Sequence, residues 1–483
     1  MARAKSPRAC DVVIVGSGPN GLTAAVMLAR AGLSVVVLEA AATPGGGCRS
    51  ADLTLPGYIH DICSAVHPMG VLSPVFRDIG LEKFGVEWMG SDLPLAHPLP
   101  DGGVAVLQKS IVATAAGLGA DGASWRGLLE PFVDESFVQS LLRPVWYPGA
   151  GSLVRKARFG LLGLRSAESV AKTRLRGGAA QALFAGCAAH SAVALDRPGT
   201  ASFGLVLALV AHLIDWPCAR GGSQEITRAL VRALEHFGGE VRLQSRVNRL
   251  RDVPDSRAVL FDLNPLQVGA ICGDDLSAGY RGRLLNFKMG PGIFKLDWAL
   301  NGPIPWRNPE CARATTVHVA GSFEEVLRSE HEMMTGRAPE TPFVLLAQQS
   351  LHDPSRAPAG KHTGWAYCHV PNGCTIDMTE RIEKQIERFA PGFRDRILAR
   401  HRINPVQLEA HNATMIGGDM AGGRNNLMQF LFRPVMQFNP YATPNPRLFL
   451  CSSSTPPGGG VHGMCGYHAA RTVMKRVFRR ALD

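Results

Sequence analysis

Three glycines near the N-terminus, Gly16, Gly18 and Gly21, have the spacing G-x-G-x-x-G, and an acidic residue, Glu39, comes after them. Glycine at these positions permits a tight turn, close approach of backbone N–H groups to a diphosphate, and close packing of a helix on a strand. A carboxylate such as that of Glu39 can accept hydrogen bonds from the ribose of an adenosine. The spacing therefore predicts a dinucleotide site, which would also include Ser17, Pro19, Asn20 and Ala40.

The segments around these residues have the patterns of the elements that such a site requires. Residues 11–15 form a short valine-rich run, typical of a strand that is buried on both faces. Residues 22–31 predict a helix, whose positive N-terminal end would attract the phosphates. Residues 34–38 predict a second strand, and Glu39 follows it directly. The order of these segments predicts a βαβ unit.

Two other segments match the glycine spacing but lack part of this context. Residues 117–122 have no strand before them, so we expect a surface loop there. Residues 458–463 lie between a predicted strand at 447–452 and a predicted helix, but no second strand with a terminal acid follows them. We therefore expect one complete dinucleotide site and no separate NAD(P) module. The C-terminal glycines would present backbone N–H groups to another part of the same cofactor.

Composition narrows the class of protein. The chain has 483 residues, a formal net charge of +11, 46% hydrophobic and 7% aromatic residues, and 11 cysteines. No basic run interleaved with aromatics indicates a nucleic-acid groove, so we expect no nucleic-acid partner. The first ten residues are basic without a following apolar segment, which argues against a secretory signal. The scattered cysteines, of which Cys368 and Cys374 are the closest pair, predict a reducing cytoplasm and no metal site.

The most apolar window, residues 201–214, is too short to span a bilayer and contains His212. We expect it to form a buried helix beside an apolar cavity. Helical patterns also occupy residues 125–142 and 380–389. Near the middle of the chain, an apolar periodicity over 226–234 predicts a helix, and alternation over 241–247 predicts a strand.

Five motifs occur in order along nearly the whole chain: DVVIVGSGPNGLTAA, PGGGCRSADLTLPGYIHDICSAVHP, ARGGSQEITRAL with SRV, FKLDWALNGPIPW, and PGGGVHGMCGYHAA. Together they resemble the FAD-dependent phytoene desaturase and carotenoid isomerase family, in the branch typified by pyridine nucleotide-disulfide oxidoreductase domain-containing protein 2. The amine oxidases are broader relatives. The resemblance implies an α/β fold, with a discontinuous Rossmann-like FAD-binding domain of the amine-oxidase type and an inserted α+β substrate-binding domain.

Strand and helix patterns typical of a nucleotide-binding domain occur at the beginning, in the middle and at the end of the chain, and they agree with that division. We expect residues 1–70, 218–285 and 425–483 to form the FAD-binding domain. Residues 71–217 and 286–424 would form the substrate-binding domain.

The resemblance also assigns cofactor contacts. The first glycine motif would hold the FAD diphosphate, and Glu39 the adenosine ribose. Gly45 and Gly46 match a glycine pair after which many relatives have arginine; this chain has Gly47 there, and Arg49 could supply the charge instead. Val247 matches the position whose backbone meets the adenine. The flavin end would be held by Gly459, Gly460, Val461 and His462, although His462 could equally cap the final helix.

Three residues are candidates for the chemistry. Ser64 and His67 lie in a segment that resembles a loop close to the flavin ring, where structural hydrogen bonds are the alternative role. Lys295 matches the strand on which amine oxidases carry a lysine near flavin N5; the alternative is a lysine at a strand end that extends to solvent. Cys465 does not match the position of a covalent flavin anchor, so we expect non-covalent FAD.

The leading functional hypothesis is an FAD-dependent oxidoreductase that moves a hydride between an apolar substrate and flavin N5, with reoxidation by oxygen or a quinone. Alternatives are a reduced-flavin-dependent double-bond isomerase, a catalytically silent flavoprotein scaffold, and amine oxidation. The basic stretches at residues 143–176 and 471–483 could contact an anionic membrane surface, or they could be basic faces exposed to solvent. The expected location is the cytoplasm, with possible contact to the inner face of a membrane.

Overall fold

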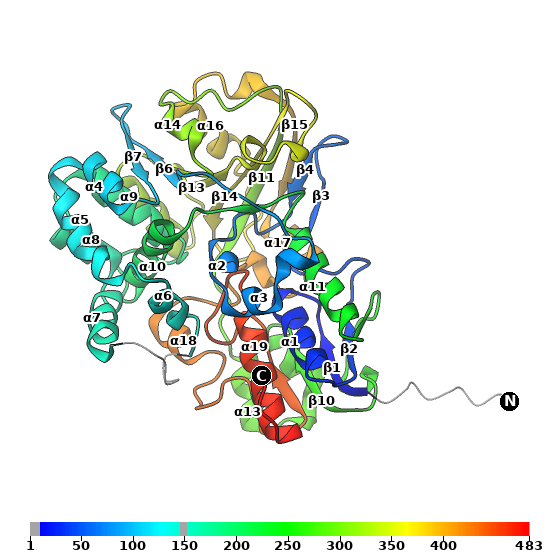
Figure 1. Ribbon diagram of the computed structural model, residues 1–483. Coiled ribbons are helices and arrows are strands. Elements are labelled where there is room, and N and C mark those ends of the chain that lie inside the picture. The colour runs from blue at the N-terminus through cyan, green and yellow to red at the C-terminus, as the bar shows by residue number, and fades with distance from the viewer. Residues whose placement is uncertain (1–9, 145–151, 483) are drawn as a thin grey trace.

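The protein is described by a computed structural model that covers residues 10–144 and 152–482. Part of the basic stretch at 143–176, including Trp146 and Tyr147, therefore lies outside the described residues. Two sheets organise the chain, and a group of helices lies beside them (Figure 1).

The first sheet is parallel, with the strand order β16-β10-β1-β2-β9. Its strands are β1 (Cys10–Val15), β2 (Val35–Leu38), β9 (Glu240–Arg242), β10 (Ser256–Phe261) and β16 (Leu448–Leu450). These segments lie far apart in the sequence, so this sheet forms only when the middle and the end of the chain return to its beginning.

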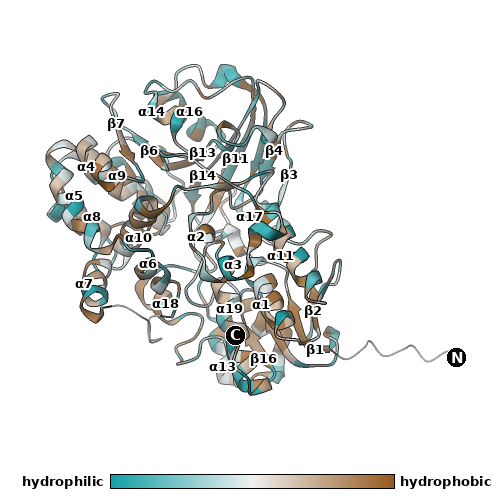
Figure 2. Cartoon of the chain, viewed as in Figure 1, coloured by the Kyte–Doolittle hydropathy of each residue, from teal (hydrophilic) through white to brown (hydrophobic). Residues whose placement is uncertain are grey.

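The valine-rich run of β1 is buried on both faces, as its composition predicts. Val12 and Ile14 pack into one core with α1 (Pro19–Arg30), α11 (Gln224–His236) and α19 (Met464–Val473). Val13 and Val15 pack into another core with α12 (Pro265–Cys272) and α13 (Ala278–Leu285). Successive residues of a strand point to opposite faces, so helices cover the sheet on both sides. Figure 2 shows the hydrophobic colour of these inner elements.

The second sheet is mixed and has the order β15-β11-β14-β13-β12-β6-β7. Its strands are β6 (Leu95–Pro98), β7 (Val104–Leu107), β11 (Gly292–Leu300), β12 (Thr316–Val319), β13 (Val344–Ala347), β14 (His362–Val370) and β15 (Ile397–Ile403). Two short ladders pair β3 (Ser50–Asp52) with β4 (Ile59–Asp61), and β5 (Trp88–Met89) with β8 (Cys218–Ala219). The α/β fold with a second, mixed domain is confirmed, while the domain boundaries stay a prediction.

A helical group joins the second sheet. It contains α4 (Ile111–Gly117), α5 (Gly122–Leu129), α6 (Glu135–Leu141), α7 (Leu153–Gly163), α8 (Ala167–Arg174), α9 (Gly178–Ala189) and α10 (Thr200–Leu213). Other helices are α2 (Pro68–Val71), α3 (Pro74–Ile79), α14 (Glu310–Arg313), α15 (Phe323–Met334), α16 (Thr379–Phe389), α17 (Pro405–His411) and α18 (Leu427–Phe432). The apolar window at 201–214 is α10, which packs on α9 inside the largest apolar core.

Three sequence predictions of local structure were wrong in detail. Residues 125–142 form two helices, α5 and α6, with a 3₁₀ turn between them that contains Pro131, which cannot continue a helix hydrogen-bond pattern. The strand predicted at 241–247 ends at Arg242. The glycines at 117–122 lie at the junction of α4 and α5 rather than in a loop.

Within the described ranges, no helix is both long and apolar enough to cross a bilayer. The same residues contain no cluster of three or more His, Cys, Asp or Glu side chains that could hold a metal ion.

Candidate functional site

The glycine turn between β1 and α1 has a geometry that only glycine accepts. Gly16 has a φ of +101°, a conformation that residues with a side chain rarely adopt. A Cβ atom on Gly21 would lie 2.4 Å from the carbonyl oxygen of Gly16, and one on Gly18 would lie 2.5 Å from the carboxylate oxygen Oδ2 of Asp262. The helix begins at Pro19, and Gly18 before it has no side chain that could cap it, so the positive end of the α1 dipole lies at this turn.

Glu39 lies next to this turn and is almost fully buried. Its Oε2 accepts hydrogen bonds from the backbone N–H of Ser17 at 3.0 Å and from the Ser17 hydroxyl at 2.5 Å. Its Oε1 accepts from the N–H of Ala41 at 2.8 Å. These bonds hold the carboxylate at the end of β2, where a ribose hydroxyl could donate to it.

One cavity of about 1110 Å³ joins the glycine turn to the second domain. Most of the predicted cofactor residues line it: Gly16, Ser17, Gly18, Pro19, Asn20, Glu39, Ala40, Gly46, Gly47, Arg49, Val247, Gly459, Gly460, Val461 and His462. Gly21 and Gly45 do not line it; they shape its wall, since Gly21 packs against Gly16 and the Gly45 N–H donates to the Ser17 carbonyl oxygen at 3.1 Å. Val247 reaches the cavity from a loop beyond the shortened strand β9.

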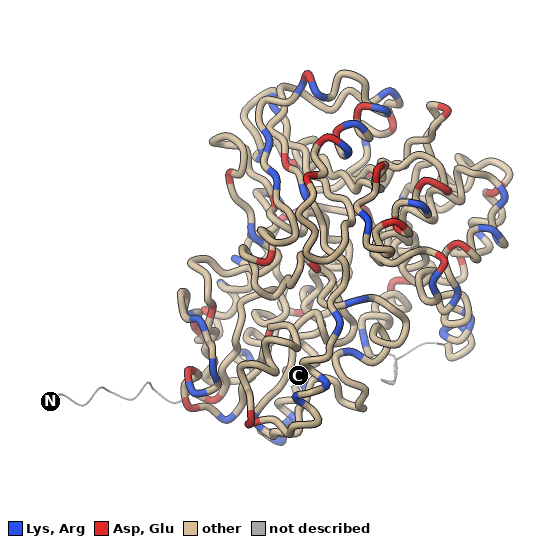
Figure 3. The backbone as a smooth tube through the Cα atoms, turned by 180° about the vertical axis from the view of Figure 1, so that it is seen from behind, with Lys and Arg blue, Asp and Glu red and all other residues tan. Residues whose placement is uncertain are grey.

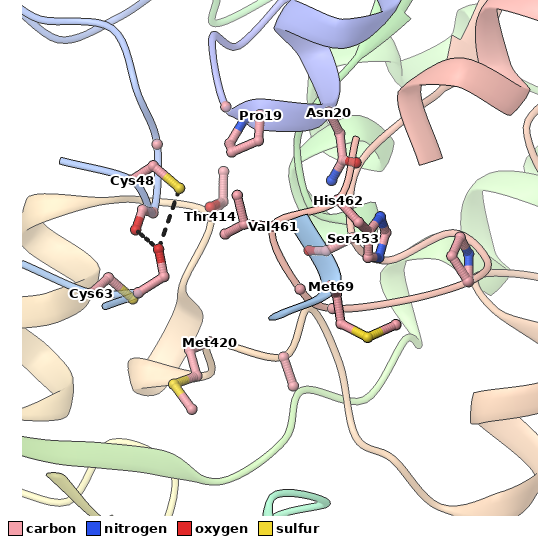
Figure 4. Close-up of a pocket in the computed structure, with 18 of the residues that line it drawn as sticks. Pro19, Asn20, Cys48, Cys63, Met69, Thr414, Met420, Ser453, Val461 and His462 are labelled. Atoms are coloured by element: carbon pink, nitrogen blue, oxygen red, sulfur yellow. Dashed lines mark hydrogen bonds between the residues drawn. The ribbon is translucent and has the colours of Figure 1, made fainter. Parts of the chain in front are cut away.

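The cavity wall contains buried polar atoms that have no hydrogen-bond partner among the described residues. They include Oδ1 of Asn20, Nε of Arg49 and Nδ1 of His67. Buried polar groups normally have partners, so such atoms indicate a ligand with complementary groups. Figure 4 shows Pro19, Asn20, Val461 and His462 close together around this space. An FAD-like dinucleotide fits these features, with its diphosphate at the glycine turn and its ribose at Glu39.

The structure places Arg49 differently from the expected phosphate contact. Its Nη2 lies 3.3 Å from Oε1 of Glu39 and donates to the carbonyl oxygen of Thr43 at 2.9 Å. Arg49 therefore neutralises Glu39, and its guanidinium is already partly engaged.

Ser64 and His67 both line the cavity, and both also make structural hydrogen bonds. The Ser64 hydroxyl donates to the Gly47 carbonyl oxygen at 2.9 Å and lies 3.3 Å from Sγ of Cys48 (dashed lines in Figure 4). Nε2 of His67 hydrogen-bonds to the Ser223 hydroxyl at 2.8 Å. Burial lowers the pKa of His67 to about 4, so its imidazole is neutral near pH 7.

His462 caps the final helix, which was the alternative considered for it. Its Nδ1 accepts a hydrogen bond from the backbone N–H of Met464 at 3.1 Å, at the start of α19. Burial lowers the pKa of His462 to about 4. A neutral ring with Nδ1 as acceptor carries its proton on Nε2.

Lys295 does not line the cavity. It is fully buried on β11, where its ammonium forms an ion pair with Asp297 two residues further on. The same carboxylate faces His60 at 3.6 Å and His401 at 3.4 Å. Burial alone would raise the pKa of Asp297, but the Lys295 charge and the neighbouring histidines bring it below its usual value. The structure therefore separates Lys295 from direct contact with a ligand in this cavity.

The second-domain end of the cavity is mainly apolar. Helix α10 contributes Phe203, Val206 and Leu207, as its apolar sequence predicts, and β14 contributes Trp365 and Tyr367. Helix α7 adds Phe159, Leu164 follows the end of that helix, and α18 adds Leu427, Phe430 and Leu431. Met69, Met420 and Cys63 also line the cavity (Figure 4).

Sequence reasoning missed several of these wall residues. Asp262 follows β10 and touches the glycine turn, and His190 faces the chamber with its Nε2 3.0 Å from Nε2 of His318. An aspartate directly after a valine- and leucine-rich run is a signal that could have indicated Asp262, since parallel strands end at a common edge. Nothing local distinguishes His190, Trp365 or Tyr367.

Comparisons with known proteins agree with this architecture. Residues 14–79 match the family model described as NAD(P)-binding Rossmann-like domain. The chain is 24% identical to pyridine nucleotide-disulfide oxidoreductase domain-containing protein 2 of Rattus norvegicus, over 96% of this chain and 93% of the relative. It is 27% identical to phytoene dehydrogenase of Streptomyces griseus, over 80% and 77%.

Among solved structures, wild-type putrescine oxidase bound to putrescine superposes with a TM-score of 0.64 at 16% identity, over 98% of this chain and 100% of that chain. At this identity the likeness concerns the fold. The N-terminal match and the overall superposition cover the two features derived above, the βαβ unit and the pairing of a parallel with a mixed sheet. Residues 14–79 are therefore similar to an NAD(P)-binding Rossmann-like domain, and the chain as a whole shares its fold with putrescine oxidase.

Proposed function

We propose that this protein is an FAD-dependent oxidoreductase that transfers a hydride between an apolar substrate and the flavin. The observation that carries the proposal is the single continuous cavity, which has a dinucleotide turn at one end and an apolar chamber at the other. Similarity to oxidoreductases along most of the chain, including a phytoene dehydrogenase, supports the same reaction class.

Bound FAD would supply the hydride chemistry at its N5 atom. The protein's own residues would bind the cofactor, orient the substrate and keep water out of the site. The glycine turn and Glu39 hold the nucleotide half, and the N–H groups before α19, in residues 459–462, face the other end. Trp365, Tyr367 and α10 exclude water from the chamber, which favours transfer of a hydride over side reactions.

An isoprenoid or another lipid-like molecule suits the chamber because its wall is mainly aliphatic and aromatic. A small cationic amine suits it less well, because none of the described residues that line the chamber is acidic, and His190, which lines it, has its pKa lowered to about 3 by burial.

The test is anaerobic mixing of the FAD-reconstituted protein with carotenoid, quinol, fatty-acyl and amine libraries. Loss of flavin absorbance with apolar compounds, and identification of an oxidised product by mass analysis, is the expected result. Isomerisation that needs reduced flavin and leaves no net oxidation would indicate the isomerase alternative. Absence of flavin from the purified protein, together with failure of reconstitution, would contradict the proposal.

We also infer that α7 contacts an anionic bilayer near the mouth of the chamber. Leu153 and Leu161 are 81% and 73% exposed, and Arg155, Lys156 and Arg158 lie on the same helix. Figure 3 shows basic positions close to residue 152, where the second described range of the chain begins. Exposed apolar and basic side chains on one helix are typical of interfacial binding, and Lys156 and Phe159 of this helix line the cavity.

Co-sedimentation with vesicles tests this contact. The full chain should bind vesicles that contain phosphatidylserine more strongly than phosphatidylcholine vesicles, and the double variant Leu153→Asp/Leu161→Asp should lose most of that binding. Val112→Asp is the matched control, because Val112 is also exposed (59%) but lies on α4. Equal loss in the control and the test variant, or equal binding to both lipids, would contradict the inference.

A further inference from the structure

Asp262 is a carboxylate built into the diphosphate end of the cavity. It follows β10, and its backbone N–H donates to the Val15 carbonyl oxygen at 2.8 Å, which anchors it beside β1. Its side-chain Oδ2 accepts a hydrogen bond from the backbone N–H of Gly21 at 2.9 Å, in the first turn of α1. Asp262 as a whole residue is partly exposed, and it lines the cavity.

The carboxyl group packs directly against the turn that would hold a diphosphate. A Cβ atom on Gly18 would lie 2.5 Å from Oδ2 of Asp262, and one on Gly21 would lie 3.0 Å from it. A diphosphate bound by the N–H groups of this turn therefore lies next to an acidic side chain. Two negative groups in a site from which water is displaced disfavour each other's ionised form.

We propose that Asp262 is protonated when a diphosphate occupies the glycine turn, so that FAD binding takes up a proton and weakens as the pH rises. The inference rests on the proposed function, because it concerns the affinity of the same cofactor site. It makes Asp262 a residue that sets cofactor affinity while also positioning the turn through Gly21.

The groups around Asp262 agree with this assignment. Glu39 adds a second negative charge from the end of β2, and Arg49 is paired with Glu39 rather than with Asp262. The thiols of Cys451, after β16, and Cys465, on α19, have their pKa values raised by burial and stay uncharged. Burial and the Glu39 charge raise the pKa of Asp262 to about 7, against the lowering effect of the hydrogen bonds from Gly21 and Gly18.

The sign of the pH dependence follows from these groups. Below about pH 7 the carboxyl group is already protonated in the free protein, so binding takes up no further proton and the Kd is flat. Above that pH the free protein must gain a proton to bind, and the Kd rises by up to about tenfold per pH unit. The variant Asp262→Asn has a neutral amide at this position, which removes the pH dependence of the Kd and can still accept the hydrogen bond from the Gly21 N–H.

The experiment is a titration of the apoprotein with FAD between about pH 5.5 and 8.5, a range in which both phosphates stay ionised. Quenching of the flavin fluorescence measures the binding. Wild type should show the rising Kd, and Asp262→Asn should show a flat one with tighter binding at the upper end. Glu39→Gln is the matched control: it removes the other carboxylate of the site and should keep most of the slope. Calorimetry of the wild type in two buffers of different ionisation enthalpy should show uptake of protons above about pH 7.

A wild-type Kd that does not change with pH, a slope that persists in Asp262→Asn, or no proton uptake would overturn the assignment while leaving FAD binding intact. Absence of FAD binding at every pH in every variant would overturn the proposed function together with it. Thermal unfolding of each apoprotein separates a change in affinity from a change in folding.

Discussion

The two ends of the cavity are built in different ways. At the nucleotide end, contacts come from backbone N–H groups and short polar side chains within one βαβ unit, such as Ser17 and Glu39. At the chamber end, the wall is assembled from α7, α10, α18 and β14, which are far apart in the sequence. The first end recognises a chemical group that many proteins bind, so its residues follow a local motif. The second end defines only a volume and a polarity, which many combinations of residues can supply.

The comparison is sharpest at Lys295: the resemblance predicts it near the flavin, whereas in the structure it is buried in an ion pair with Asp297 and does not line the cavity. Lys295→Met would leave the buried Asp297 carboxylate without its cation, and we expect the free energy of unfolding to fall by about 3–5 kcal/mol. Chemical denaturation of the apoprotein measures this change.

The double variant Lys295→Met/Asp297→Leu removes both charges and should recover most of that stability. If Lys295→Met folds as stably as the wild type but loses turnover with bound FAD, Lys295 acts on the chemistry. The separation of the buried Lys295–Asp297 ion pair from the site of the chemistry would then be wrong.

Gly21→Ala tests the nucleotide end. The new methyl group would lie 2.4 Å from the Gly16 carbonyl oxygen and must displace the turn. Such overpacking costs about 1–3 kcal/mol, so we expect the Kd for FAD to rise by about 10- to 100-fold. Gly117→Ala is the matched control, because Gly117 belongs to one of the two other glycine-spaced segments and has open space around it. A similar loss of affinity in both variants would mean that the effect is not specific to the turn.

Glu39→Ala should have a smaller effect, restricted to the adenosine half of the cofactor. The variant removes the acceptor for a ribose hydroxyl, so we expect about a tenfold weaker Kd for FAD, equal to about 1.4 kcal/mol. FMN lacks the adenosine and serves as the control ligand in the same fluorescence titration. Equal weakening of FAD and FMN would show that Glu39 acts through the structure of the turn instead.

Val206→Trp is expected to leave the nucleotide end almost untouched. Val206 lines the chamber from α10, so a larger side chain should slow flavin reduction by apolar substrates. The free energy of FAD binding should change by no more than about 0.5 kcal/mol. Anaerobic kinetics measure the rate of flavin reduction, and a separate titration measures the affinity for FAD. A large loss of FAD affinity would show that the two ends of the cavity are coupled.

Other parts of the site differ in how far the sequence could predict them. Ser64 and His67 line the cavity as expected, yet their hydrogen bonds to Gly47 and Ser223 depend on segments that meet only in the fold. Arg49 lies near the predicted site but pairs with Glu39, because the carboxylate is its nearest buried counter-charge.

Local residue patterns are sufficient to predict the turn, the helix and the carboxylate that follows, because glycine spacing limits the backbone conformation and valine runs are typical of buried strands. Which distant groups meet that turn depends on the packing of the whole fold. Asp262 reaches Gly21 across 241 residues because β10 pairs in parallel with β1, and parallel strands end at the same edge of a sheet. The chamber depends in the same way on how helices and a second sheet pack, a relation that no local spacing encodes.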